Sequence, residues 1–512
     1  MTMSPYPPTP ANNAAPSRTP EHATQAGAPS GGRRFKKRHL SMMAMGSAIG
    51  AGFFLGTGVA VSEAGPAVLV SYALAALIAV SVMFSLAELA SALPSTGSFS
   101  TYAEAGIGRW AGFTSGWLYW AMLIMVLGLE ITGAAAIFIG WFPSVPQWVV
   151  ALVIVVILGG INLMAAGDFG EVEAWLAGIK VVAIIAFLII GVGLITGVIP
   201  GRSEGLFDTL MGHGGFMPQG MSGIAVALLA IITSFGGIEI VTIAAAEADD
   251  AKAAMGAAIR SVIVRILVFY VGSVMLLILL LPWNSPDMAT SPFAAILEMA
   301  GVPAVARIME AVVFIALISA FSANIYASSR MAYSLSARGM GVRWLLGRDA
   351  GELGSTMAEA GASVDGVTAV LSEEGEGDIA RGRTPRRAVS VSIFFALVSV
   401  ALNWLLPEIL LGILINSVGM VLLIIWVFIL VAQMRLHDSL EESGRMAIRM
   451  PGWPWLPWVV LVALVVVAGL MAWNPTARQQ LIAMSVLTVI VVCLFFVKDW
   501  WMKRRAGRVA QL

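Results

Sequence analysis

Long apolar runs dominate the chain, and short polar segments separate them. A helix that crosses a membrane needs about 20 mostly apolar residues. Runs of this kind lie at 40–62, 67–92, 111–141, 147–166, 172–197, 220–246, 255–282, 304–336, 388–406, 409–433, 457–473 and 479–500. They are continuous and do not alternate apolar with polar positions, which argues against the strands of an outer-membrane barrel. The pattern therefore predicts an all-α, polytopic membrane protein with 12 transmembrane helices.

The composition excludes the main soluble classes. Of 512 residues, 59% are hydrophobic and only 12% are charged, whereas an average soluble protein has about 25% charged residues. The chain lacks the charge to cover a water-exposed surface, which argues against a soluble enzyme, a disordered protein or a nucleic-acid-binding protein. The one cysteine, Cys493, allows no intrachain disulfide.

Basic residues predict the orientation, because the cytoplasmic loops of membrane proteins are enriched in Lys and Arg. A basic cluster at 33–38 precedes the first apolar run, and further Lys and Arg residues lie within 338–387, 435–449 and 498–508. With twelve spans all of these segments fall on one side. We therefore expect a multi-pass protein of the cytoplasmic (inner) membrane, with both termini in the cytoplasm.

Two of the predicted helices carry glycine-rich interruptions near mid-span. The first contains Gly46, Gly50 and Gly52, and the sixth contains Gly236 and Gly237. Glycine weakens a helix, although for the first run alone close helix packing through G-x-x-x-G pairs explains the glycines equally well. The two interruptions lie five spans apart, so the two halves have opposite topology. This is typical of inverted-repeat transporters, whose midplane site is built from broken helices.

The ends of broken helices suit a zwitterion. N–H groups at a half-helix N-terminus attract a carboxylate, and free carbonyl groups at a half-helix C-terminus accept hydrogen bonds from an ammonium. The predicted substrate-binding residues are Ala48, Ile49, Gly50, Ala51, Gly52, Glu130, Thr233, Ser234, Phe235, Gly236 and Gly237.

Few charged residues lie deep inside the runs. A charge at mid-bilayer is costly, so each one is a candidate for function. Lys180 and Glu239 are candidates for proton coupling, because removal from water disfavours the charged form and lets such a group exchange its proton. No histidine lies within a predicted span. Glu88, near the end of the second run, favours a structural pairing with loop groups, and Asn162, Asn324, Asn403 and Asn416 favour hydrogen bonds between helices.

Motifs for other chemistry are scarce. The chain has no Gly-Lys pair and hence no Walker A loop for ATP. A G-x-S-x-G pattern at 201–205 has no preceding strand, so it lacks the context of a hydrolase nucleophile. No His/Cys cluster has metal-ligand spacing. We therefore expect a protein that is not an enzyme and needs no metal or cofactor.

Several short motifs, taken together, are specific enough to indicate a family. They are His39-Leu40-Ser41, Ala64-Gly65-Pro66-Ala67, Gly97-Ser98-Phe99-Ser100-Thr101-Tyr102, Gly116-Trp117-Leu118-Tyr119-Trp120, Pro282-Trp283-Asn284 and Ser329-Arg330-Met331. With them the chain resembles the bacterial amino acid permeases of the amino acid/polyamine/organocation superfamily. The stretch 239–247 looks most like that of γ-aminobutyrate permeases.

The resemblance implies a LeuT-like fold, in which helices 1–5 and 6–10 form an inverted repeat with helices 1 and 6 broken, and two helices follow. It divides the chain into a first repeat (39–198) and a second repeat (199–434). The composition adds a disordered tail (1–38) before them and a cytoplasmic insertion at about 341–384 within the second repeat. Helices 11 and 12 then occupy 435–501, and a cytoplasmic tail occupies 502–512.

The resemblance also implies roles for residues. The substrate carboxylate meets the N–H groups of Gly50, Ala51 and Gly52, and the amino group meets the carbonyls of Ala48 and Gly236. Lys180 matches a lysine whose ammonium takes the place of Na⁺ in sodium-coupled relatives. Ala51 stands where many members have Ser or Thr, which is explained either by a longer γ-amino acid substrate or by neutral variation.

These inferences predict a secondary active transporter that imports γ-aminobutyrate or a neutral amino acid across the cytoplasmic membrane by proton symport. A proton-independent exchanger and a non-transporting amino acid sensor are the alternatives. The expected partners are the small-molecule substrate, protons and the lipid bilayer, with no nucleic acid.

Overall fold

The computed structural model describes residues 49–93, 98–164, 169–202, 205–237, 251–301, 303–350, 385–407, 409–444, 446 and 448–509. Within these ranges the regular structure is helical throughout, without a strand. The prediction of an all-α protein is therefore confirmed.

The first part of the chain, up to residue 237, begins with a short π-helix. Its helices are η1 (Gly52–Gly56), α2 (Thr57–Ala64), η2 (Gly65–Ala67), α3 (Val68–Ala92), α4 (Ser98–Gly106), α5 (Arg109–Trp141), α6 (Gln147–Met164), α7 (Phe169–Thr196), α8 (Leu206–Met211) and α9 (Gly220–Phe235).

The second part contains another π-helix, η3, between two α-helices. Its helices are α11 (Ala251–Arg265), η3 (Ile266–Val271), α12 (Gly272–Leu280), α13 (Pro286–Thr290), α14 (Pro292–Met299), α15 (Pro303–Ala337), η4 (Arg343–Ala350), α18 (Arg386–Leu405), α19 (Leu410–Glu442), α20 (Trp455–Trp473) and α21 (Pro475–Val509).

Ten helical runs among the described residues are long and apolar enough to cross a membrane. Each of the twelve predicted spans overlaps a helix, although the first and sixth extend into 40–48 and 238–246, outside the described residues. The multi-pass prediction is confirmed, and the count of twelve stays a prediction. Of the predicted insertion at 341–384, the first part, up to residue 350, is described and includes η4, and the rest lies outside the described residues.

One helix differs from its predicted length. α19 continues past the apolar run that ends at 433 and reaches Glu442. His437 therefore lies inside this helix, and only 3% of it is exposed. The expectation that no histidine lies within a span is wrong here, because the helix continues through buried polar residues that an apolar-run criterion omits.

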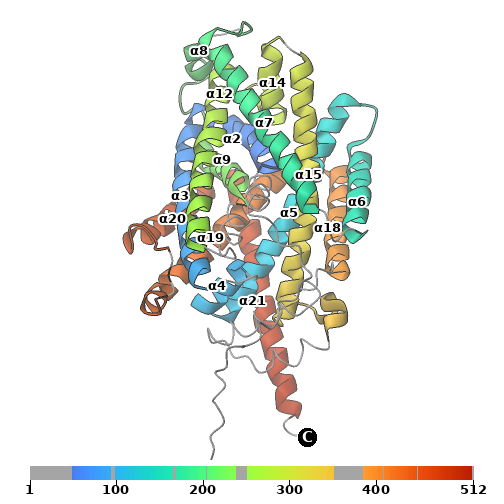
Figure 1. The fold of residues 1–512 in the computed structure, drawn as a ribbon, viewed down its shortest axis with the longest axis vertical. Coiled ribbons are helices and arrows are strands. Elements are labelled where there is room, and N and C mark those ends of the chain that lie inside the picture. Colours follow the sequence, from blue (N-terminus) through green and yellow to red (C-terminus); the bar gives the residue numbers. More distant parts are fainter. Residues whose placement is uncertain are drawn as a thin grey trace, which may run out of the picture. The chain divides into compact units, whose positions relative to one another are not determined.

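α9 lies at the centre of the helix bundle. It packs against α2, α3 and α19, and its residues from Gly223 to Phe235 are all buried. α15 packs along α5 and also contacts α7 and α18. Figure 1 shows α4 at the opposite end of these helices from α8 and α14. α4 lies between the second and third predicted spans, so the end of the molecule near α4 is the predicted cytoplasmic end.

Apolar and polar side chains are distributed as a membrane requires. Val156, Val465 and Val489 on α6, α20 and α21 are large apolar residues exposed on the outside, as expected for surfaces in contact with lipid. Polar contacts lie between helices instead. Asn162 donates to Ser322 Oγ at 2.8 Å, and Asn403 donates to Thr132 Oγ1 at 2.9 Å. These are the predicted hydrogen bonds between helices.

Candidate functional site

The described part of the first span begins at its predicted interruption. Ile49 and Gly50 form a bend, and the N–H groups of Phe53 and Phe54 both donate to the carbonyl of Gly50, at 3.1 and 3.2 Å. The first N–H groups of a helix have no acceptor within it. The segment from Gly50 to Gly52 therefore presents the N-terminal end of a half-helix, with main-chain donors suited to an anion.

The sixth span is interrupted at the predicted glycines. α9 ends at Phe235, and Gly236 leaves the helix with a ψ of 141°. Gly237 has a φ of +95°, in the region that favours glycine because a side chain is strained there. The last carbonyl groups of α9 lack helical N–H partners, so this end presents acceptors.

The two half-helix ends are in direct contact. The single hydrogen of the Ser234 hydroxyl is shared between two carbonyl oxygens, that of Gly52 and that of Ala230, the latter 2.9 Å from Oγ. A Cβ atom on Gly52 would lie 2.7 Å from Thr233 O and 2.8 Å from Ser234 Cα. Both neighbours are main-chain atoms that do not rotate away. Glycine at position 52 is therefore required for the close approach of η1 to α9.

A cavity lies at this junction. Its polar surface comes from the two helix ends together with Tyr119, Glu130 and Asn324. The rest of its wall is apolar, formed by side chains of α5 and α19: Met122, Leu123, Val126, Leu129, Val418 and Leu422. An apolar cavity with a few converging polar groups is the usual form of a small-molecule site.

The cavity brings together most of the residues predicted from the sequence. They are Gly50, Ala51, Gly52, Glu130, Thr233, Ser234, Gly236 and Gly237. Ile49 and Phe235 are buried next to these residues in the chain but are not part of the lining. Ala48 and Glu239 lie outside the described residues.

The hydroxyl groups of Thr233 and Ser234 hold helices together. Thr233 Oγ1 lies 2.6 Å from Ile415 O on α19 and 3.0 Å from Leu229 O, and these two carbonyls share its one hydrogen. Ser234 bonds to Gly52 as described above. Because these hydroxyls already have acceptors, the groups that α9 offers to the cavity are mainly those of its main chain.

Glu130 is the charged residue of the lining. It lies on α5 and is 2% exposed. Its Oε1 accepts a hydrogen bond of 3.0 Å from Asn324 Nδ2 on α15, and a Cβ atom on Gly50 would lie 3.6 Å from the same oxygen. Glu130 thus places a carboxylate beside the helix-1 interruption.

Lys180 lies on α7 and is 1% exposed. Its Nζ donates to Ser319 Oγ on α15 at 3.3 Å. The next residue of α15, Ala320, is the neighbour that a Cβ on Gly50 would meet at 3.4 Å, and Asn324 one turn further bonds to Glu130. Neighbouring turns of α15 therefore connect the buried lysine to the helix-1 interruption and to the carboxylate of the cavity.

An aromatic cluster packs around the junction. The ring of Phe53 lies 4.8 Å from that of Tyr270 and 5.4 Å from that of Phe293, measured between centroids. Phe235 packs on Tyr270 at 5.2 Å. The Tyr270 hydroxyl donates to Ser234 O at 2.7 Å. Tyr270 belongs to η3, so the cluster joins two π-helical segments, which are frequent at functional sites.

The apolar part of the lining was not predicted. Met122, Val126, Val418 and Leu422 are ordinary residues of apolar runs, and the sequence contains no signal that separates them from residues facing lipid. Among the described residues, no group of three or more His, Cys, Asp or Glu side chains is placed to hold a metal ion.

Comparison with known proteins decides the family. The profile of the family described as "Amino acid permease" matches residues 39–347 and 377–510. The chain belongs to the amino acid permease family. It is therefore an amino acid transporter of the membrane and not an enzyme, as predicted.

Relatives of the permease have different substrates in their names. The aromatic amino acid transport protein AroP of Corynebacterium glutamicum is 44% identical over 91% of this chain and 95% of its own length. The γ-aminobutyric acid permease of Escherichia coli is 38% identical over 92% of this chain and 95% of its own length, and that of Bacillus subtilis is 36% identical over 91% and 93%.

Proposed function

We propose that the permease imports a neutral amino acid with a large apolar side chain across the cytoplasmic membrane, in symport with protons. The observation that supports this most strongly is the cavity itself. It joins both helix interruptions, one carboxylate and an apolar wall in a single space.

The common part of an amino acid fits the two helix ends. The N–H groups of Gly50, Ala51 and Gly52 are the donors for the substrate carboxylate, since the positive end of a helix dipole favours an anion. The carbonyls at the end of α9, including that of Gly236, and the carboxylate of Glu130 are the acceptors for the substrate ammonium.

The apolar wall accounts for the choice of side chain. Met122, Val126, Val418 and Leu422 offer no hydrogen bond to a polar side chain, and burial of apolar surface is worth roughly 25 cal/mol per Å². γ-Aminobutyrate has no side chain to bury against this wall. The 44% identity to a protein named for aromatic amino acid transport points the same way. γ-Aminobutyrate remains the second candidate, because permeases named for it are 36 and 38% identical.

Lys180 is the proposed proton carrier. A buried ammonium is costly in a low-dielectric interior, so gain and loss of a proton change the stability of the conformation around it. Because α15 contacts Lys180, Gly50 and Glu130 together, a change in charge at Lys180 acts on the same helix that borders the cavity. Glu239 is the second proposed coupling residue and follows the glycines of the sixth span.

Transport with purified permease in proteoliposomes tests these points. Uptake of labelled phenylalanine should be reduced by excess unlabelled phenylalanine far more than by γ-aminobutyrate, alanine or proline. An inward proton gradient should drive accumulation above the external concentration. Strong competition by γ-aminobutyrate alone would replace the proposed substrate, and uptake that needs internal amino acid but no gradient would identify an exchanger. Binding without flux would identify a sensor.

A further inference from the structure

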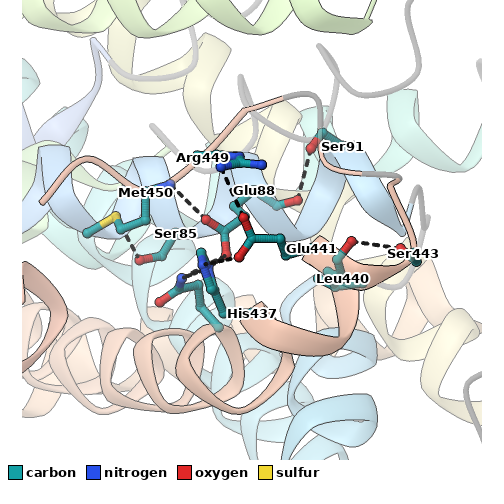
Figure 2. Close-up of polar contacts among 10 residues, drawn as sticks. Ser85, Glu88, Ser91, His437, Leu440, Glu441, Ser443, Arg449 and Met450 are labelled. Carbon is teal, nitrogen blue, oxygen red and sulfur yellow. Dashed lines mark hydrogen bonds and ion pairs between the residues drawn. The ribbon is translucent and has the colours of Figure 1, made fainter. Parts of the chain in front are cut away.

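A second group of buried titratable residues lies away from the cavity, at the predicted cytoplasmic ends of α3 and α19. Glu88 of α3 is fully buried, and both of its carboxylate oxygens accept hydrogen bonds (Figure 2). Oε1 accepts from Gln433 Nε2 at 2.8 Å and lies 2.7 Å from His437 Nδ1. Oε2 accepts from the main-chain N–H of Met450 at 2.7 Å.

The far side of the His437 ring faces a second carboxylate. His437 Nε2 lies 3.8 Å from Glu441 Oε2, and Glu441 also pairs with Arg449 at 3.0 Å. The imidazole stacks on the Trp453 ring, with 3.8 Å between centroids and an angle of 20°. Among the described residues, Glu88, Glu441 and Arg449 are the charged groups that face this ring from α3, α19 and the segment before α20.

The two ring nitrogens of His437 have different surroundings. When Glu88 is ionised, its Oε1 can only accept, so the hydrogen of the 2.7 Å contact lies on His437 Nδ1. The remaining position is Nε2, which points toward Glu441, a residue that is partly exposed. A proton at Nε2 turns the ring into an imidazolium, so its hydrogen bond to Glu88 becomes an ion pair, with both donor and acceptor charged. Glu441, 3.8 Å from Nε2, adds electrostatic attraction for this charge. Proton binding therefore strengthens the link between α3 and α19.

The link joins parts of the chain that meet around the substrate cavity. α3 supports α9, whose end lines the cavity, and α19 supplies Val418 and Leu422 to the cavity wall. The Met450 N–H adds the segment that leads into α20. None of these contacts involves α7 or α15, which carry Lys180 and Ser319.

We propose that Glu88, Gln433 and His437 form a second proton-binding site, which senses the pH of the predicted cytoplasmic side and sets the rate of transport. A proton on His437 holds the ends of α3 and α19 together and slows the opening that releases substrate. Loss of this proton weakens the link and allows the ends to separate. The inference rests on the proposed sidedness and on amino acid transport, and it does not require symport at Lys180.

Exchange in proteoliposomes isolates this site from a proton gradient. Labelled phenylalanine outside is exchanged for unlabelled phenylalanine inside, or the corresponding pair of γ-aminobutyrate if that proves to be the substrate, with the same pH on both sides. Over about pH 5 to 8, the exchange rate should fall roughly five- to tenfold on acidification, the effect expected when the donor of one hydrogen bond gains a charge.

Variants identify the residue responsible. His437→Asn keeps an amide donor for Glu88 but does not titrate, so its exchange rate should vary less than about twofold over the same range. His213→Asn is the matched control, because this histidine lies in the segment between α8 and α9, and it should keep the wild-type profile. A wild-type profile in His437→Asn would overturn the proposal.

A second variant keeps the test decisive if His437→Asn does not fold. Glu441→Gln removes only the partly exposed carboxylate, so the fall in exchange rate on acidification should be smaller than in the wild type, because the imidazolium loses one nearby negative charge; an unchanged profile would overturn the proposal. Lys180→Met separates this proposal from symport. Normal gradient-driven accumulation in Lys180→Met would refute symport at Lys180 and leave the His437 result intact.

Discussion

Asn324 on α15 donates a hydrogen bond of 3.0 Å to Glu130 on α5, and both residues line the same cavity. The bond crosses 194 positions of sequence and fixes the orientation of the carboxylate beside Gly50. A carboxylate held in this way acts on a ligand without first paying the entropy of ordering its own side chain.

Glu130→Gln should raise the KM for amino acid uptake roughly tenfold or more, because a hydrogen bond to a charged group is worth about 1.5–3 kcal/mol. The substituted amide still accepts a bond from Asn324, so folding should be preserved. Initial uptake rates over a range of substrate concentrations measure the effect. Glu310→Gln is the control, since Glu310 bonds to Trp141 Nε1 and lies outside this cavity. An unchanged KM in Glu130→Gln would remove Glu130 from the binding site.

Lys180→Met should abolish accumulation driven by a proton gradient, because the variant has no proton to exchange at this position. Exchange of internal for external amino acid at equal pH should continue, which shows that the protein is folded and inserted. Lys498→Met is the control; Lys498 donates to Gly339 O at 2.6 Å at the predicted cytoplasmic end. Accumulation at the wild-type level in Lys180→Met would contradict the proposed coupling.

Gly52→Ala should abolish transport and lower the stability of the protein. The added Cβ meets the main chain of Thr233 and Ser234 at 2.7 and 2.8 Å, and overpacking of this kind costs typically 1–3 kcal/mol. Thermal unfolding in detergent and uptake measure the two effects. Gly160→Ala on α6 is matched, because no described atom lies within 4 Å of the Cβ that alanine adds there. Equal unfolding temperatures for the two variants would be inconsistent with the contact.

Val126→Phe should distinguish between the two candidate substrates. A larger side chain on the apolar wall reduces the space for phenylalanine, and a misfit of this size changes specificity roughly 10- to 200-fold. γ-Aminobutyrate, which has no side chain, should be affected much less. Competition by each compound against labelled substrate provides the measurement, and Val182→Phe, at an exposed position of α7, is the control. A similar loss for both compounds would argue against the proposed role of the wall.

The helix interruptions were predictable because their signal is local. Gly50, Gly52, Gly236 and Gly237 weaken a helix wherever it packs, and buried charges such as Glu130 and Lys180 are rare enough to stand out in apolar runs. The contacts between them were not predictable in the same way. Which residue of α15 meets Lys180 or Glu130 depends on the rotation of that helix against α5 and α7, and a nearly uniform apolar sequence does not determine it.

The same limit explains why the residues of the cavity wall were not predictable. Val418 and Leu422 face the cavity, whereas Val427 of the same helix is exposed, and all are equally apolar. His437 was missed for the opposite reason, since polar residues at the end of α19 are buried by α3 and by the segment before α20. Glu88 does pair with the N–H of a loop residue, Met450, as predicted, but its other partners, Gln433 and His437, belong to a helix.

The closeness of Gly52 to α9 has a consequence for how such proteins diversify. In the proposed site the amino and carboxylate groups common to the substrates meet main-chain atoms of the two helix ends and the carboxylate of Glu130. These contacts persist whatever other residues evolution places there, provided that Glu130 and the glycines are kept. The variable part of the substrate meets interchangeable side chains on α5 and α19. A few exchanges on that wall can therefore give a permease a new nutrient without rebuilding its transport cycle, which suits a scaffold shared by proteins named for aromatic amino acids and for γ-aminobutyrate.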